Sequence, residues 1–125
     1  MNKVLLVEDD LNLGIMIHDL LELSGYEVKL LRLADQTIKC LQQDQFDLVI
    51  MDKLLNGMDG TVICSEIRKT DTISDTPVPM MSALDGAKTL CIKAGATNFI
   101  SKPFEIEDLL AKVKDVIRHE TDIGD

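Results

Sequence analysis

Polar side chains that could carry chemistry follow the apolar runs of this sequence. The acidic triplet Glu8–Asp10 comes after the first run, Asp52 after the third, and Ser82 and Lys102 after the last two. Carboxylates crowded into one pocket repel one another, and a divalent cation such as Mg²⁺ offsets that repulsion. An ammonium and a hydroxyl beside a carboxylate can also hold phosphoryl oxygens while the carboxylate attacks phosphorus. These residue types therefore suit Mg²⁺ binding and phosphoryl transfer to a carboxylate, provided that the fold brings them together.

Five apolar runs of strand length alternate along the chain with five segments of helical period. The runs are Val4–Val7, Val28–Leu31, Leu48–Met51, Val78–Met81 and Asn98–Ile100. The helical segments are Leu11–Leu23, Ala34–Gln43, Gly60–Lys69, Gly86–Lys93 and Glu105–His119. This alternation predicts an α/β domain, with a five-stranded parallel sheet of flavodoxin-like (βα)5 topology, strand order 2-1-3-4-5 and helices on both faces.

The predicted strand order brings the polar residues to one edge of the sheet. Strands 1, 3 and 4 are adjacent and strand 5 follows strand 4, so Glu8, Asp52, Ser82 and Lys102 converge at the carboxyl ends. The apolar stripes of two helices predict the side chains that face the sheet. They are Leu11, Ile15, Leu20, Leu21 and Leu23 in the first helix, and Val62, Ile63 and Ile67 in the third.

Length, charge and cysteine content indicate the class of protein. The chain of 125 residues has the size of one domain, which we expect over residues 1–119, with a frayed polar tail over residues 120–125. A net charge of −9 argues against direct binding of nucleic acid or of an anionic membrane. Cys40, Cys64 and Cys91 lack CxxC spacing, which predicts reduced core thiols. Without a signal peptide or an apolar run of about 18 residues, we expect a cytoplasmic protein.

Five short segments resemble, in their order along the chain, the motifs of one family. They are Val7–Asp10, Asp52–Gly60, Ser82-Ala83, Ala94–Ala96 and Phe99–Phe104. Each fragment alone is a weak signal, but five in order at the expected strand ends are a strong one. From Val4 to about Ile117 the chain resembles the receiver domain of bacterial two-component response regulators.

The resemblance implies a role for each acidic residue. Asp52 is expected to accept a phosphoryl group, and Asp9 and Asp52 are expected to bind Mg²⁺ directly. Glu8 would act through a bound water, and the backbone carbonyl of Leu54 would be the remaining protein ligand. The domain would be a phosphoacceptor switch rather than an enzyme.

The resemblance also implies a partner and a conformational change. Ser82 and Lys102 would contact the phosphoryl oxygens, and Phe99 would turn inward as Ser82 moves. The Lys102-Pro103 bond would be cis. The donor would be a histidine kinase or a phosphotransfer protein. Phosphorylation would remodel the face of the fourth helix, fifth strand and fifth helix for an unidentified downstream protein, and the chain would be a monomer or a weak, phosphorylation-dependent dimer.

Four features depart from the family's pattern. Asn56 replaces the usual proline, which predicts a less stiff loop. The segment Ser82–Ala94 is short, which predicts a truncated fourth helix or leading loop. Pro79 lacks a ladder donor, which predicts a bulge or a shortened strand. Thr97-Asn98 replaces the acidic pair frequent in receivers that dimerise through the fourth helix, fifth strand and fifth helix, so we do not assume that dimer.

Leu54 and Leu84 bear on the lifetime of a phosphorylated state. Each lies two residues beyond a site residue, where family members often carry polar side chains that orient the hydrolytic water. Apolar side chains at both places predict slow autodephosphorylation.

Two other functions stay open at this point. A degenerate receiver could serve as a constitutive docking adaptor. Pro79 and the short fourth-helix region keep this interpretation open. The complete set of expected site residues argues against it, namely Glu8, Asp9, Asp52, Ser82 and Lys102. A small-molecule enzyme or flavin carrier on the same topology would need a glycine-rich phosphate loop after the first strand, where this chain has Glu8–Asp10 instead.

Overall fold

The computed structural model describes residues 2–124, and their side chains over residues 2–117. Five parallel strands form a sheet in the order β2-β1-β3-β6-β7, which confirms the predicted topology. The strands are β1 (Lys3–Val7), β2 (Glu27–Leu31), β3 (Leu48–Asp52), β6 (Pro79–Ser82) and β7 (Asn98–Ser101). The helices are α1 (Leu11–Leu23), α2 (Thr37–Gln43, after the 3₁₀ turn Ala34–Gln36), α3 (Gly60–Lys69), α4 (Ala87–Ala94) and α5 (Ile106–Gly124). Helix α5 thus includes most of the segment expected to be a frayed tail.

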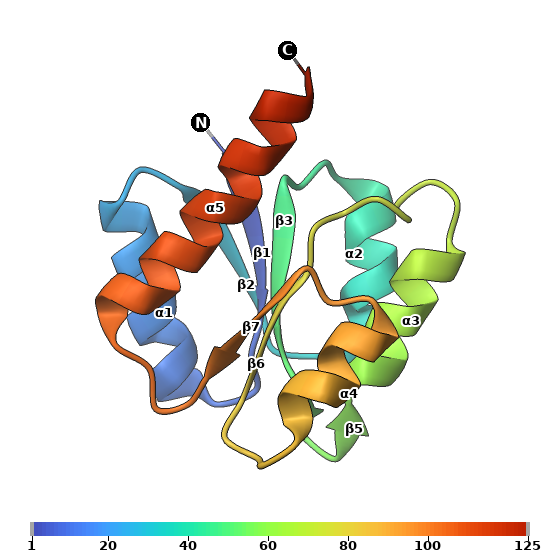
Figure 1. Cartoon of the computed structure of the whole chain (residues 1–125), viewed down its shortest axis with the longest axis horizontal. Helices are drawn as coiled ribbons and strands as arrows, with labels where there is room; N and C mark the ends of the chain where they lie inside the picture. Colours follow the sequence, from blue (N-terminus) through green and yellow to red (C-terminus); the bar gives the residue numbers. More distant parts are fainter. Residues whose placement is uncertain (1, 125) are drawn as a thin grey trace.

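The helices cover both faces of the sheet, as Figure 1 shows, with α1 and α5 on one face and α2, α3 and α4 on the other. Each face has a separate apolar core. Leu6, Ile17 and Val113 belong to the core under α1 and α5. The three cysteines belong to the core under α2, α3 and α4, and all three are free and buried, which confirms the prediction of reduced core thiols.

The inward faces of α1 and α3 differ from the predicted stripes. The buried residues of α1 are Gly14, Ile17 and Leu21. Leu11 and Ile15 are each 45% exposed, and Val62 of α3 is 56% exposed while Cys64 is buried. Ile63 and Ile67 of α3 are buried as predicted, whereas Leu21 is the one buried residue of the stripe predicted for α1. Apolar residues lie on more than one side of both helices, so periodicity alone did not separate the buried ones from the exposed ones.

Pro79 is the first residue of β6, a position where a strand tolerates proline. The Val49 N–H donates to the Pro77 carbonyl at 3.0 Å. The next donor of a parallel ladder would be the N–H of residue 79, which proline lacks. The pairing of β6 with β3 accordingly covers two residues of each strand, the shortening that the sequence predicted. The strand nevertheless ends at Ser82, next to the other strand ends.

An unexpected hairpin follows β3 directly. Strands β4 (Leu54–Leu55) and β5 (Met58–Asp59) pair antiparallel around the turn Asn56-Gly57. Both turn residues have positive φ, 51° for Asn56 and 86° for Gly57, a combination typical of type I′ hairpins. Proline has its φ fixed near −65° and could not occupy position 56. The segment thus has the form of a regular hairpin, and its lower stiffness stays a prediction.

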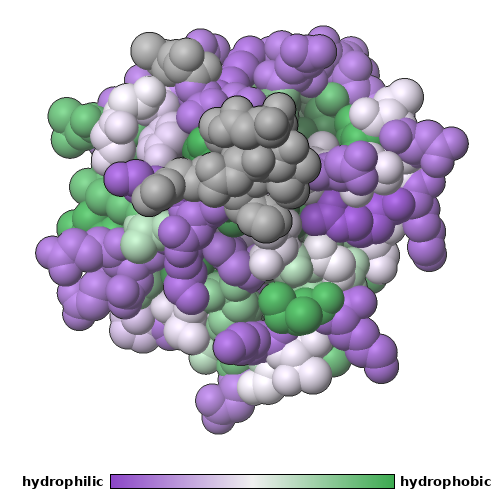
Figure 2. Space-filling view, turned by 45° about the horizontal axis from the view of Figure 1, so that its top comes forward, coloured by the Kyte–Doolittle hydropathy of each residue, from purple (hydrophilic) through white to green (hydrophobic). Residues whose placement is uncertain are grey.

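The surface seen in Figure 2 is mostly hydrophilic, and its apolar residues lie in small separate patches. In the described part of the chain, no helix is both long enough and apolar enough to cross a membrane.

Candidate functional site

The strand ends bring the predicted site residues to one edge of the sheet, the lower edge in Figure 1. Glu8 follows β1, Asp52 ends β3, Ser82 ends β6 and Lys102 follows β7. Glu8, Asp52 and Ser82 are polar, yet they are only 1%, 6% and 4% exposed. Buried polar side chains are costly unless they are paired, so their partners define the site.

Lys102 bridges the two buried carboxylates. Its Nζ donates a hydrogen bond to Oδ2 of Asp52 and lies 3.4 Å from Oε1 of Glu8. The backbone N–H of Lys102 donates to the Ser82 carbonyl at 2.9 Å, which fixes the lysine beside the end of β6. The Lys102-Pro103 peptide bond is cis, which confirms the expectation from the resemblance.

Burial sets the protonation of this cluster. Loss of hydration raises the pKa of Glu8 from 4.5 to about 7, against the opposing charge of Lys102, and the nearby charge of Asp52 raises it further. Burial also disfavours the charge on Lys102, but the hydrogen bond and charge of Asp52 outweigh that effect, so the pKa of Lys102 is raised. Glu8 is therefore partly protonated near neutral pH, where one ammonium faces the two carboxyl groups.

The oxygen ligands expected for Mg²⁺ lie around this cluster. Asp9 is adjacent to Glu8 and is partly exposed. Among residues 2–117, no three acidic, histidine or cysteine side chains are gathered as a ready metal centre. Mg²⁺ needs only one or two carboxylates, with water and other oxygens completing its shell, so Asp9 and Asp52 with the Leu54 carbonyl are chemically suited to it.

The loops after β3 and β6 have the same local arrangement. The Leu54 N–H donates to Oδ1 of Asp52 at 3.1 Å, and the Leu84 N–H donates to Oγ of Ser82 at 3.0 Å. Each site residue is thereby oriented by the backbone two residues later. The side chains of Leu54 and Leu84 are 59% and 56% exposed, so both flank the site without being packed into the core.

Lys53 and Asp59 belong to the surroundings of the site, and the sequence analysis did not identify them. Their side chains pair at 3.4 Å. Asp59 caps α3 by accepting from the N–H and hydroxyl of Thr61 at 2.9 and 2.7 Å. Gly60 begins the helix so close to β3 that a Cβ there would overlap the Asp52 carbonyl oxygen. An aspartate directly before a helical segment was the available signal for this cap.

Phe99 and α4 belong to the expected output face and share one core. Phe99 is 8% exposed and belongs to the same core as Ala87 and Cys91, the two buried residues of α4. The helix has eight residues, and Gly86 precedes it with a φ of 76° and no capping side chain. This confirms the short fourth helix expected from the sequence.

Comparison with known sequences gives a consistent family. The model of the response regulator receiver domain family matches residues 4–114. The transcriptional regulatory protein BaeR of Escherichia coli is 33% identical over 118 residues, which cover 93% of this chain and 48% of that protein. The response regulator ArlR of Staphylococcus saprophyticus is 32% identical over 122 residues, which cover 96% of this chain and 54% of that protein. The chain spans about half the length of these curated relatives.

Solved structures agree with the sequence comparison. The chemotaxis protein CheY4 of Vibrio cholerae has a TM-score of 0.84 and 29% identity, with 93% of this chain and 98% of that chain covered. The receiver domain of the sensor histidine kinase PA1611 of Pseudomonas aeruginosa has a TM-score of 0.84 and 28% identity, with 93% and 97% covered, and its structure has magnesium in the active site cleft. With its topology, its strand-end residues and these matches, the chain belongs to the family of response regulator receiver domains, which serve in two-component phosphorelay signalling.

Proposed function

We propose that Asp52 accepts a phosphoryl group from a phosphohistidine of a histidine kinase or phosphotransfer protein. The buried cluster of Asp52, Glu8 and Lys102 is the observation that supports this most directly. Two carboxylates in low-exposure positions repel each other, and packing alone gives no reason to retain them there. A phosphoacceptor site needs this combination of a nucleophilic carboxylate, a cation and nearby oxygen ligands.

The proposed transfer is an in-line displacement at phosphorus. A carboxylate oxygen of Asp52 forms the new O–P bond while the P–N bond to the donor imidazole breaks. The electron pair of that bond stays on the imidazole nitrogen. Lys102 then donates to a phosphoryl oxygen instead of the free carboxylate, and the Ser82 hydroxyl donates to another.

The chain's own oxygens suit a divalent cation in this reaction. Asp9 and Asp52 would bind Mg²⁺ directly, with the Leu54 carbonyl, and Glu8 would act through a bound water. When bound, Mg²⁺ supplies positive charge that offsets the negative charge gathered on the phosphoryl oxygens. Burial raises the pKa of Glu8 to about 7 and the charge of Asp52 raises it further, so a cation beside these carboxylates would favour the ionised form of Glu8.

An apolar collar around the site supports a protein as the phosphoryl donor. Six apolar side chains that follow the strand ends are 40–59% exposed, namely Leu11, Ile15, Leu54, Met58, Leu84 and Ile106. Apolar side chains left exposed at the same edge of a domain suit contact with a protein. A small-molecule donor would need no such surface.

The expected output is a change in the face formed by α4, β7 and α5. Only small inward side chains, Ala87 and Cys91, are buried on α4, and the helix lacks a side-chain cap. Such a helix has little to hold it in one position, so movement of Ser82 and Phe99 toward the phosphoryl group would displace it. The receiver would then act on a downstream protein as a monomer or a weak dimer.

Intact mass spectrometry tests the proposal. Wild type and Asp52→Asn are incubated with acetyl phosphate, with Mg²⁺ and with EDTA. We expect one phosphoryl adduct on the wild type, dependent on Mg²⁺, and none on the variant. No adduct on the wild type, under conditions that label a control receiver, would contradict the proposal and favour the docking adaptor.

Slow hydrolysis of the phosphorylated state is a second expectation for the same site. The exposed side chains of Leu54 and Leu84 offer no polar group to orient an attacking water. Replacing Leu54→Asn together with Leu84→Glu should accelerate loss of the phosphoryl group by about tenfold or more. Decay of the adduct is followed by intact mass after removal of the donor, and a wild-type lifetime of seconds would refute slow hydrolysis.

A further inference from the structure

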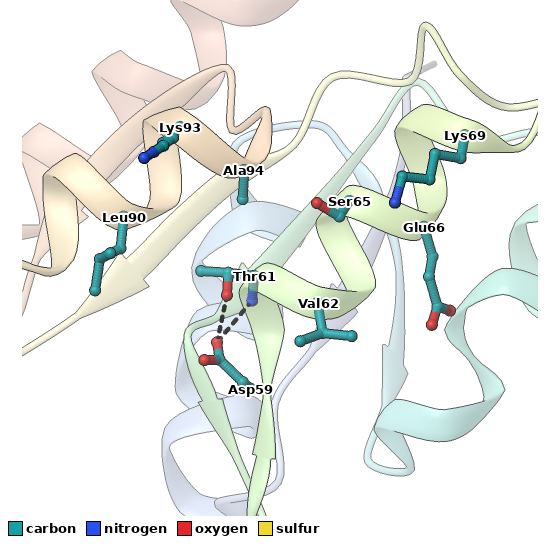
Figure 3. Close-up of a pocket in the computed structure, with 9 residues that line it drawn as sticks. All are labelled: Asp59, Thr61, Val62, Ser65, Glu66, Lys69, Leu90, Lys93 and Ala94. Carbon is teal, nitrogen blue, oxygen red and sulfur yellow. Dashed lines mark hydrogen bonds between the residues drawn. The ribbon is translucent and has the colours of Figure 1, made fainter.

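A groove separates α3 from α4 on the side of the molecule away from α1 and α5. Its cavity volume is about 480 Å³, and Figure 3 shows the residues that line it. Val62 of α3 and Leu90 of α4 contribute apolar side chains from the two sides of the groove, and they are 56% and 53% exposed. Neither is needed for the core of the domain, so the apolar surface of the groove is open to a partner.

The charges of the groove are separated along its length. Asp59 caps the start of α3, while Lys69 ends α3 and Lys93 lies in the last turn of α4. Asp59 forms an ion pair with Lys53 and accepts two hydrogen bonds from Thr61, which Figure 3 draws as dashed lines. Among the residues whose side chains are described, Lys69 and Lys93 have no ion pair, and Glu66 of α3 lines the groove near Lys69 (Figure 3). This end of the groove thus carries two lysines and one glutamate, a net charge of +1, on a protein whose net charge is −9.

We propose that this groove binds an amphipathic helix of a partner protein, with acidic residues in the first turn of that helix. The partner helix runs antiparallel to α3 and α4. Its carboxylates pair with Lys69 and Lys93, and its apolar stripe covers Val62 and Leu90.

The geometry of the groove favours a helix as the occupant. Both α3 and α4 return from the carboxyl ends of parallel strands, so they run in the same direction, and a third helix can pack its side-chain ridge between them. A strand has no open sheet edge to join here because these helices cover the face of the sheet (Figure 1).

The electrostatics favour one direction of that helix. The carbonyl ends of α3 and α4 lie at the lysines, so an antiparallel helix places its N-terminal end there and the helix dipoles oppose each other. Carboxylates in a first turn also stabilise their own helix. The lysines and the partner's acidic turn therefore match in both charge and position. The inference goes beyond the phosphoacceptor function and does not require Asp52 to be phosphorylated.

Two synthetic peptides test the inference on the unphosphorylated chain. Both have about 15 residues and the same composition, with leucines at i, i+3, i+4 and i+7 spacing, but one has its glutamates in the first turn and the other in the last. Each carries a nitroxide label at its N-terminus. Binding is followed by ¹⁵N–¹H NMR titration. We expect the first peptide to bind about tenfold more tightly and its label to broaden the signals near Lys69 and Lys93.

Variants of the groove supply the controls. Leu90→Gln should weaken binding of the first peptide by about tenfold, whereas Ile92→Gln, which alters an exposed residue of α4 outside the groove lining, should not. The double change Lys69→Glu with Lys93→Glu should reverse the preference, so that a peptide with lysines in its first turn binds best. Circular dichroism confirms that each variant is folded.

Several results would overturn the inference. Equal affinity of the two peptides would mean that Lys69 and Lys93 serve only to stabilise the ends of their own helices. Chemical shift changes confined to another surface, such as the apolar collar around Asp52, would place the binding elsewhere. Absence of binding by either peptide at millimolar concentration would also refute it.

Discussion

Two lysines at opposite edges of the sheet each bridge two carboxylates, but in different surroundings. At the carboxyl edge, Lys102 pairs with Asp52 and Glu8, and the exposed fractions of these side chains are 19%, 9% and 2%. At the amino edge, Lys3 pairs with Asp44 and Glu27, and the exposed fractions are 27%, 48% and 57%. The two clusters therefore contain the same kinds of charged group, but water reaches the carboxylates of the amino edge far more than those of the carboxyl edge.

The degree of burial determines how each cluster affects the pKa values of its members and the stability of the domain. Water solvates the charges at the amino edge, so that cluster contributes little to stability. The hydrogen bond between Lys3 and Asp44 raises the pKa of Lys3 and lowers the pKa of Asp44, so both side chains stay charged. At the carboxyl edge, desolvation raises the pKa of Glu8 to about 7, which makes its ionised form costly. The comparison indicates that stability alone gives no reason for the buried cluster, which supports the proposed role in phosphoryl transfer.

Removing the buried lysine should have the largest effect. In Lys102→Met the two carboxylates lose their shared cation, so we expect a loss of about 3 kcal/mol in the free energy of unfolding in EDTA at pH 8. The initial rate of phosphorylation by acetyl phosphate should fall by about 100-fold. Urea denaturation and intact mass measure the two effects. A variant that is phosphorylated at the wild-type rate would show that Lys102 is not part of the acceptor site.

Neutralising the buried glutamate should act in the opposite direction. The pKa of Glu8 is raised on folding from 4.5 to about 7, so between these values the folded protein binds more protons than the unfolded chain. Stability from this group is therefore present at low pH and is lost as the pH rises toward 7. Glutamine at position 8 does not ionise, so the variant Glu8→Gln does not lose this stability as the pH rises. We expect it to be more stable than the wild type by about 3 kcal/mol at pH 8 in EDTA.

Measuring unfolding at several pH values separates this effect from a gain in stability that does not depend on pH. The advantage of Glu8→Gln should shrink as the pH falls from 8 to 5. Glu27→Gln is the matched variant in the exposed cluster, and it should follow the wild type throughout. A constant difference between Glu8→Gln and the wild type over this range would contradict the assigned cause.

Removing the exposed lysine should have the smallest effect. Lys3→Met should leave the midpoint of thermal unfolding within the scatter of replicate measurements and the phosphorylation rate unchanged, because water replaces the lost ion pairs. Lys3 also lies over the Phe46 ring at 5.1 Å, an arrangement that the methionine side chain can occupy. A large loss of stability would mean that the two edges are more alike than their exposure indicates.

The parts of the fold that the sequence predicted are those with long-range regularity. Glu8, Asp52 and Lys102 were found because each follows an apolar run, and parallel strands bring such ends together. The hairpin after Asp52 was missed because two-residue strands have no period to detect. The role of Arg68 was missed as well. Its guanidinium donates to the main-chain carbonyls of Ser74, Thr76 and Gly95. Every residue has such a carbonyl, so these contacts leave no pattern in the sequence.

Helix faces were the other weakness of the sequence analysis. Leu11, Ile15 and Val62 are apolar but exposed, and they line the collar or the groove instead of the core. A hydrophobic residue placed for a partner protein has the same pattern in a sequence as one placed for the core. Only the packing of the helix on the sheet separates the two.

The sheet also divides the molecule into two apolar cores that share no residue. Phe99 belongs to one core and its neighbour Ile100 to the other, because successive residues of a strand point to opposite faces. Substitutions at distant positions in different cores should then be additive, while those within one core depend on each other. Over evolutionary time the α1–α5 side could therefore change to suit a new partner without altering which substitutions the α2–α4 side tolerates.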